Sequence, residues 1–488
     1  MSNTGSTMQR LPLVVEIPNP PGPSQAFQAF KDKPFSFFLD SGMGSQRLGR
    51  YSFLGSDPFL IMRSRGRDIN LIRPGGEKVV SGNPFDVLGD LLQEYRLDGN
   101  PSSLPFVGGA VGYLSYNLGH FIEKLPSKAV DDLQLPECYL GFYDAVAIFD
   151  NLESRAYIAS TGFPEKGGAW QARAKARLEE LKQRVAQAPR LGEDQPSYSD
   201  QPARSKVNLR SNFTHEAYLE AVQKARDYII AGDIFQVNLS QRFEADMPLP
   251  PYELYQRLRK INPAPFASYL NFDGVAVVSA SPERFLLLRC DRVETRPIKG
   301  TRPRGKDPLG DEALARELVN SFKDKAEHVM IVDLERNDIG RVCRFGTVRV
   351  SELTALEKYA TVFHLTSTVE GSLRPGKNAI DLLKATFPGG SISGAPKVRA
   401  IEIIDELEPT RRSVYTGSIG YLSFDGGLDL NIVIRTILVK QGKAYFQVGG
   451  AVVYDSDPES EYVETLDKAR ALIQALSMVP QMAAEGHR

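Results

Sequence analysis

The chain has 488 residues, of which 42% are hydrophobic and 24% are charged, proportions that are ordinary for a globular protein. Its 59 basic residues nearly balance its 60 acidic residues, and a net charge of −1 provides no overall field that would attract nucleic acid or a membrane surface. No stretch approaches the run of about 18 apolar residues that a membrane span needs, and the N-terminus lacks a signal-peptide pattern, so we expect a cytoplasmic protein.

The first part of the chain has three compositions in succession. Residues 1–25 are polar and rich in proline, which predicts an extended arm. Residues 26–186 alternate short apolar runs with Gly, Asp and Pro turns and end in a helical pattern from Trp170 to Ala186, so we expect a strand-rich domain. Residues 187–212 contain few apolar side chains and are predicted to be a linker, with the domain boundary there.

Residues 213–480 are predicted to form a second domain, followed by a tail at 481–488. Thr214 is a candidate N-cap for its first helix, and the segment from Ile234 to Ser240 reads as a strand. Further helices are expected at 326–337, 379–387, 396–407 and 459–476, and antiparallel strands at 413–424, 430–440 and 444–454. Long antiparallel strands beside helices indicate an α+β fold rather than a regular βαβ series.

The three cysteines, Cys138, Cys290 and Cys343, are odd in number and scattered, without the spacing of metal ligands. We therefore expect reduced thiols in the protein core. None of them stands in the Gly-x-Cys-x-Gly pattern of a glutamine amidotransferase.

Lys299 lies in an unusual segment, Arg296 to Gly305, that holds three arginines, two prolines and two glycines in ten residues. This composition predicts a stiff cationic loop rather than a helix or a central strand. Like charges and partial burial would lower the pKa of Lys299 and make its amine a nucleophile. The alternative is a solvated basic turn.

Two acidic pairs have helical spacing: Asp324 with Glu327, and Glu461 with Glu464. Residues three apart share one face of a helix, so two such helices could present carboxylates to one Mg²⁺ ion. No His-Glu-x-x-His pattern is present, which favours a hard cation over zinc. The alternative for each pair is a solvated acidic face.

Three further positions carry candidate chemistry. His364 lies inside an apolar run and is either a hydrogen-bonded core residue or a general acid or base. Arg435 interrupts an apolar strand, so it must form a salt bridge or meet a carboxylate ligand. The glycine-rich turn before Lys397 could bind an anion through its backbone N–H groups, but it lacks the Walker A spacing.

Together and in order, these segments resemble the chorismate-utilising enzymes, which include component I of anthranilate synthase and of aminodeoxychorismate synthase, isochorismate synthase and salicylate synthase. The resemblance covers nearly the whole chain and is sharpest over Ile234–Ser240, Ser281–Phe285, Pro297–Arg302, Glu327–Asp338, Ser391–Lys397 and Asp455–Thr465. It implies antiparallel β-sheets in a sandwich-like core with helices packed outside.

The resemblance also implies roles for individual residues. Glu327 and Glu464 would bind Mg²⁺, with Asp324 and Glu461 close by. The metal would hold the ring carboxylate of chorismate, and Tyr415 and Arg435 would hold the enolpyruvyl carboxylate. The remaining substrate-site residues would be His364, Ser391, Gly300, Thr301, Gly449, Lys468 and Gln236.

Two positions divide the family by reaction. Members that add water carry a lysine base where this chain has Gln236, and a neutral amide cannot deprotonate water. Aminodeoxychorismate synthases have lysine at the position of Lys299, where anthranilate synthases usually have alanine, and Ser391 points the same way. The resemblance thus implies an enzyme that converts chorismate and ammonia to 4-amino-4-deoxychorismate through a covalent bond to Lys299, with Glu283 as the acid.

Two alternatives stand beside this interpretation: the activity of anthranilate synthase component I, and a non-catalytic ligand-binding subunit. Ammonia would come from solution or from a separate glutamine amidotransferase subunit. Asp40, Ser41 and Pro263 match the tryptophan pocket of anthranilate synthases. Ala264 stands where those enzymes have serine, which argues against feedback control.

Overall fold

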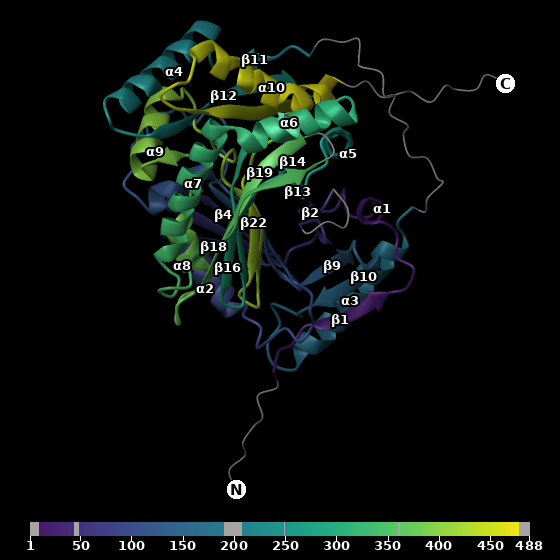
Figure 1. The fold of residues 1–488 in the computed structure, drawn as a ribbon. Helices are drawn as coiled ribbons and strands as arrows, with labels where there is room; N and C mark the ends of the chain where they lie inside the picture. Colours follow the sequence, from purple (N-terminus) through teal and green to yellow (C-terminus); the bar gives the residue numbers. More distant parts are fainter. Residues whose placement is uncertain (1–8, 43–47, 190–206, 248, 360–361, 478–488) are drawn as a thin grey trace, which may run out of the picture.

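Two large β-sheets form the centre of the molecule, and helices cover their outer sides (Figure 1). The computed structural model describes residues 9–42, 48–189, 207–247, 249–359 and 362–477. Each sheet has 12 strands, and all pairings between the named strands of the described residues are antiparallel. The predicted α+β fold with a sandwich-like antiparallel core is confirmed.

The first sheet joins strands from both halves of the chain. In order across it lie β1 (Leu13–Ile17), β10 (Arg155–Ser160), β9 (Ala145–Asp150), β3 (Tyr51–Gly55), β2 (Ser36–Asp40), β13 (Phe266–Phe272), β14 (Val275–Ser281), β23 (Thr436–Lys440), β24 (Lys443–Val452), β12 (Gln236–Asp246) and β11 (Arg210–Ser211), with β20 (Gly394–Ala395) also paired to β12. The pairing of β2 with β13 connects the two halves.

The second sheet is built in the same mixed way. Its order is β17 (Ile298–Pro303), β19 (Val362–Ser372), β16 (Arg292–Arg296), β15 (Arg284–Arg289), β22 (Leu428–Asn431), β21 (Ser418–Ser423), β7 (Gly109–Leu114), β8 (Cys138–Tyr143), β4 (Leu60–Arg65), β5 (Asp68–Arg73) and β6 (Gly76–Ser81), with β18 (Arg349–Lys358) also paired to β19. Here β7 pairs with β21. Most of the predicted linker, residues 190–206, and the predicted tail lie outside the described residues.

The main core lies between the sheets. Phe37 and Val277 of the first sheet belong to the same buried cluster as Tyr113, Phe142 and Tyr421 of the second. Aromatic rings dominate their contacts; the Phe37 and Tyr143 rings, for example, meet edge to face with centroids 4.6 Å apart. Alternating apolar side chains on both sheets therefore share one interior.

Six of the ten described helices lie where the sequence predicts them, whereas those that begin at Pro23, Pro84, Pro251 and Pro308 were not predicted. The ten are α1 (Pro23–Phe27), α2 (Pro84–Glu94), α3 (Ala169–Ala186), α4 (His215–Ile230), α5 (Pro251–Ile261), α6 (Pro308–Asn320), α7 (Phe322–Gly340), α8 (Ala379–Thr386), α9 (Lys397–Leu407) and α10 (Pro458–Ser477), with a 3₁₀ helix at Tyr116–Phe121. Thr214 caps α4 by accepting a hydrogen bond from the Ala217 N–H at 3.2 Å. None of the described helices is long and apolar enough to cross a membrane.

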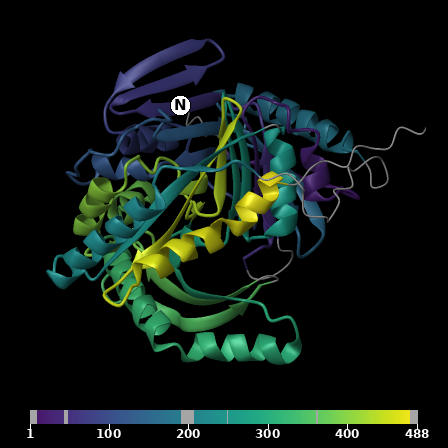
Figure 2. The same ribbon diagram turned by 90° about the horizontal axis from the view of Figure 1, so that it is seen from above.

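The helices of the C-terminal half pack on different sheets. Helices α5, α9 and α10 cover β14, β12 and β24 of the first sheet, whereas α6 and α7 cover β17 and β19 of the second (Figures 1 and 2). Helix α10 and helix α7 thereby approach the same region from different sheets. This region holds the candidate site.

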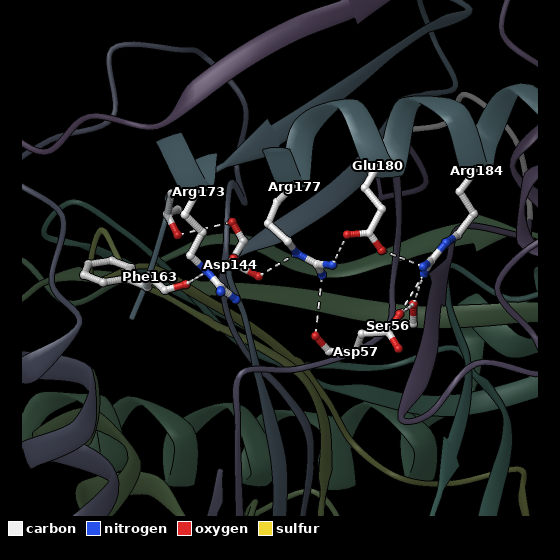
Figure 3. Close-up of polar contacts among 9 residues, drawn as sticks. Ser56, Asp57, Asp144, Phe163, Arg173, Arg177, Glu180 and Arg184 are labelled. Carbon is white, nitrogen blue, oxygen red and sulfur yellow. Dashed lines mark hydrogen bonds and ion pairs between the residues drawn. The ribbon is translucent and has the colours of Figure 1, made fainter. Parts of the chain in front are cut away.

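The helix α3 is tied to the N-terminal strands by a chain of ion pairs (Figure 3). The Asp144 side chain is fully buried and accepts from Arg173 Nε at 2.8 Å and from Arg177 Nε at 3.3 Å. Arg184, two turns beyond Arg177 on α3, pairs with Asp57 at 2.8 Å and with Glu180 at 2.8 Å. The buried carboxylate is thus compensated by two guanidinium groups, as a buried charge requires.

Four predictions of local structure were wrong. The expected single strand 430–440 is two strands in different sheets, because Arg435 has a φ of 51° and the chain crosses between the sheets there. The expected loop around Lys299 is the edge strand β17, whose register shifts at Gly300. Residues 13–17, expected in an extended arm, pair with β10. Cys290 is exposed in a turn, while the other two cysteines are buried.

Candidate active site

The two acidic pairs lie on α7 and α10, and these helices bring Glu327 and Glu464 close enough to influence each other's ionisation. Burial raises the pKa of Glu327. Burial would also raise the pKa of Glu464, but the ion pair with Lys468 at 2.7 Å leaves that pKa below its usual value. Glu464 therefore loses its proton at a lower pH than Glu327.

Glu461 lies beside Gly450, where the absence of a side chain leaves space next to its carboxylate. Its Oε1 accepts from Ser456 Oγ at 2.6 Å, while its buried Oε2 has no hydrogen-bond partner among the described residues. A Cβ atom at Gly450 would lie 2.9 Å from Glu461 Oε2 and 3.4 Å from Glu464 Oε1. A buried carboxylate oxygen without a partner needs a donor or a cation.

The chemistry of these donors fits Mg²⁺, because all are carboxylate oxygens. Across the described residues, however, no three His, Cys, Asp or Glu side chains form a ready-made metal group. Glu327, Glu461 and Glu464 are the residues that would hold the ion. Asp324 lies beside them but is engaged with Arg302 at 3.1 Å. The metal site stays a prediction.

Lys299 is the second residue of β17 and lies half-buried in the field of these carboxylates. Burial lowers the pKa of its amine, and Lys468 adds to this effect, whereas Glu327, Glu283 and Glu464 oppose it. The next residue, Gly300, has a φ of 75°, and a Cβ there would lie 2.9 Å from Leu318. Glycine therefore allows the strand to turn at the lysine.

Glu283 follows β14 and is only 4% exposed. Burial raises its pKa to about 7, although the nearby Ser391 hydroxyl, Lys299 and the Ile298 N–H oppose the shift. Ser391 Oγ is itself buried without a hydrogen-bond partner of normal geometry in the described chain. A carboxyl group with this pKa can release and recover a proton near neutral pH.

His364 on β19 is 3% exposed, and its Nδ1 lies 2.8 Å from Thr301 Oγ1. Burial, together with the charge of Arg435, lowers its pKa to about 3. The imidazole is therefore neutral at physiological pH. Of the two roles considered from the sequence, this favours the neutral, hydrogen-bonded residue, because an imidazole with so low a pKa holds a proton poorly near neutral pH.

Arg435 is half-buried at the crossing between the sheets, and burial lowers its pKa. In the part of the chain that the structure describes, its guanidinium has no ion pair, which removes the structural salt bridge as an explanation. Tyr415 precedes β21 in the chain and is partly buried. The Arg412 guanidinium lies 5.8 Å from the centroid of its ring. A free buried guanidinium is suited to an anionic ligand.

The other predicted substrate residues surround these groups on β12 and β24. Gln236 is fully buried, and its Oε1 has no partner among the described residues. The Gly449 carbonyl accepts from Lys468 Nζ at 2.8 Å. A Cβ at Gly449 would lie 2.4 Å from the Leu239 carbonyl, so only glycine allows β24 and β12 to approach here.

Two polar residues on the buried side of α7 were not identified from the sequence. His328 is fully buried and lies 2.5 Å from Ser367, and Glu335 accepts from Thr295 Oγ1 at 2.8 Å. Burial lowers the pKa of His328 to about 4 and raises that of Glu335. Polar residues that recur every three or four positions from Glu327 to Asp338 were the available signal.

Lys397, at the end of the glycine-rich turn, forms an ion pair with Asp338 and donates to the Thr386 carbonyl at 2.9 Å. It therefore ties the turn to α7 and α8. The same turn holds Ser391, whose hydroxyl lies beside Glu283. The charge of Lys397 is used within the protein.

The predicted tryptophan pocket coincides in part with a cavity of about 330 Å³ between the sheets. Asp40 and Ser41 line it, but Pro263 does not. Asp40 pairs with Arg259 and accepts from Tyr255 at 2.9 Å, and Ser41 Oγ donates to a backbone carbonyl at 2.6 Å. Both polar groups are already engaged, and tryptophan binding stays a prediction.

Comparisons with known proteins identify the family. Residues 51–474 match the family described as chorismate binding enzyme. Anthranilate synthase component 1 of Acetivibrio thermocellus is 41% identical over 93% of this chain and 92% of its own length. Aminodeoxychorismate synthase component 1 of Bacillus subtilis is 41% identical over 89% of this chain and 91% of its own length.

Solved structures show the same fold. Anthranilate synthase component I of Streptococcus pneumoniae superimposes with a TM-score of 0.75 and 33% identity, over 88% of this chain and 93% of that one. The menaquinone-specific isochorismate synthase of Escherichia coli gives 0.69 at 18% identity over 95% and 94% of the two chains, a likeness of fold alone. The chain belongs to the chorismate binding enzyme family.

Proposed function

We propose that this chain is component I of an aminodeoxychorismate synthase, which makes 4-amino-4-deoxychorismate from chorismate and ammonia for 4-aminobenzoate and folate synthesis. The observation that carries the proposal is the placement of Lys299 in the electrostatic field of Glu283 and the acidic pairs, with a pKa lowered by burial. A lowered pKa increases the share of an amine in its neutral, nucleophilic form, and a carboxyl group with a pKa of about 7 is an acid suited to the same step.

In the proposed reaction, Lys299 Nζ forms a bond to C2 of chorismate, the two conjugated ring double bonds shift, and the C4–O bond breaks. Glu283 gives its proton to the departing hydroxyl, which leaves as water. Ammonia then forms a bond to C4, both double bonds shift back, and the bond between C2 and Lys299 breaks. The added ammonia returns one proton to the Glu283 carboxylate, so both side chains are restored and pyruvate is retained.

The remaining residues bind and orient the substrate in this proposal. Arg435, with Tyr415, receives the enolpyruvyl carboxylate, because its guanidinium has no protein partner in the described chain. Neutral His364 lines the ring. Bound Mg²⁺ would supply positive charge against the ring carboxylate beside Glu327 and Glu464.

Anthranilate synthase component I is the alternative, since relatives with that name are as similar as those named aminodeoxychorismate synthase. Lys299 favours an aminodeoxychorismate synthase, because formation of anthranilate does not need a covalent amine at C2. A non-catalytic subunit is disfavoured, since the chain carries a candidate acid, a candidate nucleophile and a candidate carboxylate-binding group in Glu283, Lys299 and Arg435. Because the relatives are called component 1, a separate glutamine amidotransferase is the proposed source of ammonia.

The deciding experiment uses the purified chain with chorismate and Mg²⁺ but without ammonia. We expect a covalent adduct on the peptide that contains Lys299, detected by mass spectrometry, and its loss in Lys299→Ala. Lys306→Ala, which changes an exposed lysine on the same segment, serves as the control. On adding ammonia, product formation by Lys299→Ala should be slower by about 10²–10⁴. Pyruvate and anthranilate without an adduct would establish the alternative.

A further inference from the structure

A second, much smaller cavity lies beside Tyr415 and has no role in the scheme above. Its volume is about 20 Å³, enough for one molecule of the size of water. The lining runs from the partly exposed Tyr445 to the largely buried Tyr415 and includes Val414, Val433 and Gln447. The cavity thus extends from the outer region of β24 to a predicted substrate residue.

Gln447 presents an unused acceptor at this cavity. The side chain is 3% exposed, and its buried Oε1 has no hydrogen-bond partner in the part of the chain that the structure describes. Its amide nitrogen is fixed: Nε2 donates to Ser240 Oγ at 2.8 Å and lies 3.4 Å from Glu408 Oε2. The amide carbonyl therefore has the free position.

The surrounding hydrogen bonds determine which way this amide faces. Ser240 Oγ donates to Glu408 Oε1 at 2.7 Å, so the hydroxyl can only accept from Gln447. A flipped amide would direct its carbonyl oxygen at the Glu408 carboxylate, which is held by Arg412. The orientation with Oε1 unpartnered is therefore the favourable one, and the oxygen needs a donor from outside the protein.

The charged groups in the lining select against cations. They are Arg242 and Arg412, whereas their partners Asp132 and Glu408 do not line the cavity. Positive charge on the walls disfavours an ammonium ion relative to a neutral molecule of the same size. Water and ammonia are the small neutral donors that meet both conditions.

We propose that this cavity is a binding site for one neutral, water-sized hydrogen-bond donor, and that during turnover the donor is ammonia on its way to the substrate. Gln447 Oε1 accepts from its N–H and holds it beside Tyr415, which also lines the cavity. This inference rests on the proposed use of ammonia by the chain.

The test measures the KM for free ammonia, at constant pH, with chorismate and Mg²⁺ saturating. Gln447→Met removes the acceptor with little change in volume and should raise this KM about tenfold, the effect of losing one hydrogen bond. The KM for chorismate and the formation of the Lys299 adduct without ammonia should change by less than about twofold. Val414→Ile, which narrows the same cavity, should act in the same direction and provides a second variant if Gln447→Met does not fold.

Gln241→Met is the matched control. Gln241 is buried to the same degree on the neighbouring strand, has partners at both ends of its amide, and does not line the cavity. A KM for ammonia that stays within about twofold of wild type in the folded variants, or that rises in parallel with the KM for chorismate, would overturn the proposal. Identification of the product in each assay separates this outcome from failure of the proposed function, because anthranilate synthesis also consumes ammonia.

Discussion

Glu464 and Lys468, one turn apart on α10, form an ion pair of 2.7 Å, and Lys468 also donates to the Gly449 carbonyl on β24 at 2.8 Å. The lysine therefore connects the helix that carries the carboxylate to the strand that faces it. This contact orients Glu464 toward Glu327 and Lys299 before any ligand binds.

Replacing this carboxylate tests its proposed role as a metal ligand. Glu464→Ala should lower the Mg²⁺-dependent activity by about 100-fold or more, since a metal ligand contributes several kcal/mol to binding the transition state. Glu459→Ala is the control: Glu459 lies on the same helix but is exposed and contacts His215 at 2.9 Å. Full activity of Glu464→Ala in the presence of a chelator would remove Glu464 from the metal site.

Glu283 should make stability depend on pH. Its folded-state pKa of about 7 lies above the usual value, so the folded state binds the proton more tightly than the unfolded state. The stability contributed by that proton is complete below about pH 4.5 and is lost as the pH rises through about 7. Urea unfolding should therefore show that Glu283→Gln gains up to about 3 kcal/mol over wild type between these limits. If the difference in unfolding free energy between Glu283→Gln and wild type were the same at about pH 4.5 and about pH 7, Glu283 would not titrate in this range.

Arg435 should trade stability for substrate binding. Arg435→Met removes a buried charge without an ion pair in the described structure, so the free energy of unfolding should rise by about 1–2 kcal/mol. The same change should raise the KM for chorismate about 100-fold, because a charged hydrogen-bonding group is lost. Arg412→Met is the opposite case: its partner Glu408 would be left buried and unpaired, and the protein should become less stable. A change of the free energy of unfolding in the same direction for Arg435→Met and Arg412→Met would contradict this account.

The ion pairs of α3 provide a test of fold stability. Asp144→Asn leaves Arg173 and Arg177 without their buried carboxylate and should cost about 3–5 kcal/mol in urea unfolding. Glu180→Gln, on the same helix but with a side chain that is 42% exposed, should cost less than about 1 kcal/mol. Comparable losses would mean that the buried carboxylate is no more important than the exposed one.

Helices α3, α4, α7, α8, α9 and α10 could be predicted because their signals are local, whereas α1, α2, α5 and α6 were missed. Thr214 caps α4, and the three-residue spacings of Asp324 with Glu327 and of Glu461 with Glu464 place each pair on one helical face. That α7 and α10 converge is a property of the two sheets, which no local pattern contains. The unequal partners of the acidic residues, such as Arg302 for Asp324, follow from this tertiary arrangement.

The strands were less predictable where tertiary pairing decides the backbone. Apolar residues continue through the segment around Arg435 without a sign that the chain leaves one sheet for the other. Residues 13–17 have an exposed edge position and gain their structure from β10. Gln447 carried no signal at all, since its importance depends on Ser240 and Glu408, which are distant in sequence.

The interleaving of the sheets has a consequence for how this protein can change. Since β2 pairs with β13 and β7 pairs with β21, the first 186 residues supply strands to both sheets and close the core with partners from the second half. A crossover between two relatives near residue 200 would place foreign side chains against each other in the two core clusters that both halves share. Recombination within this chain should therefore preserve function only when both halves come from parents with matching interiors, so that the two halves must evolve together.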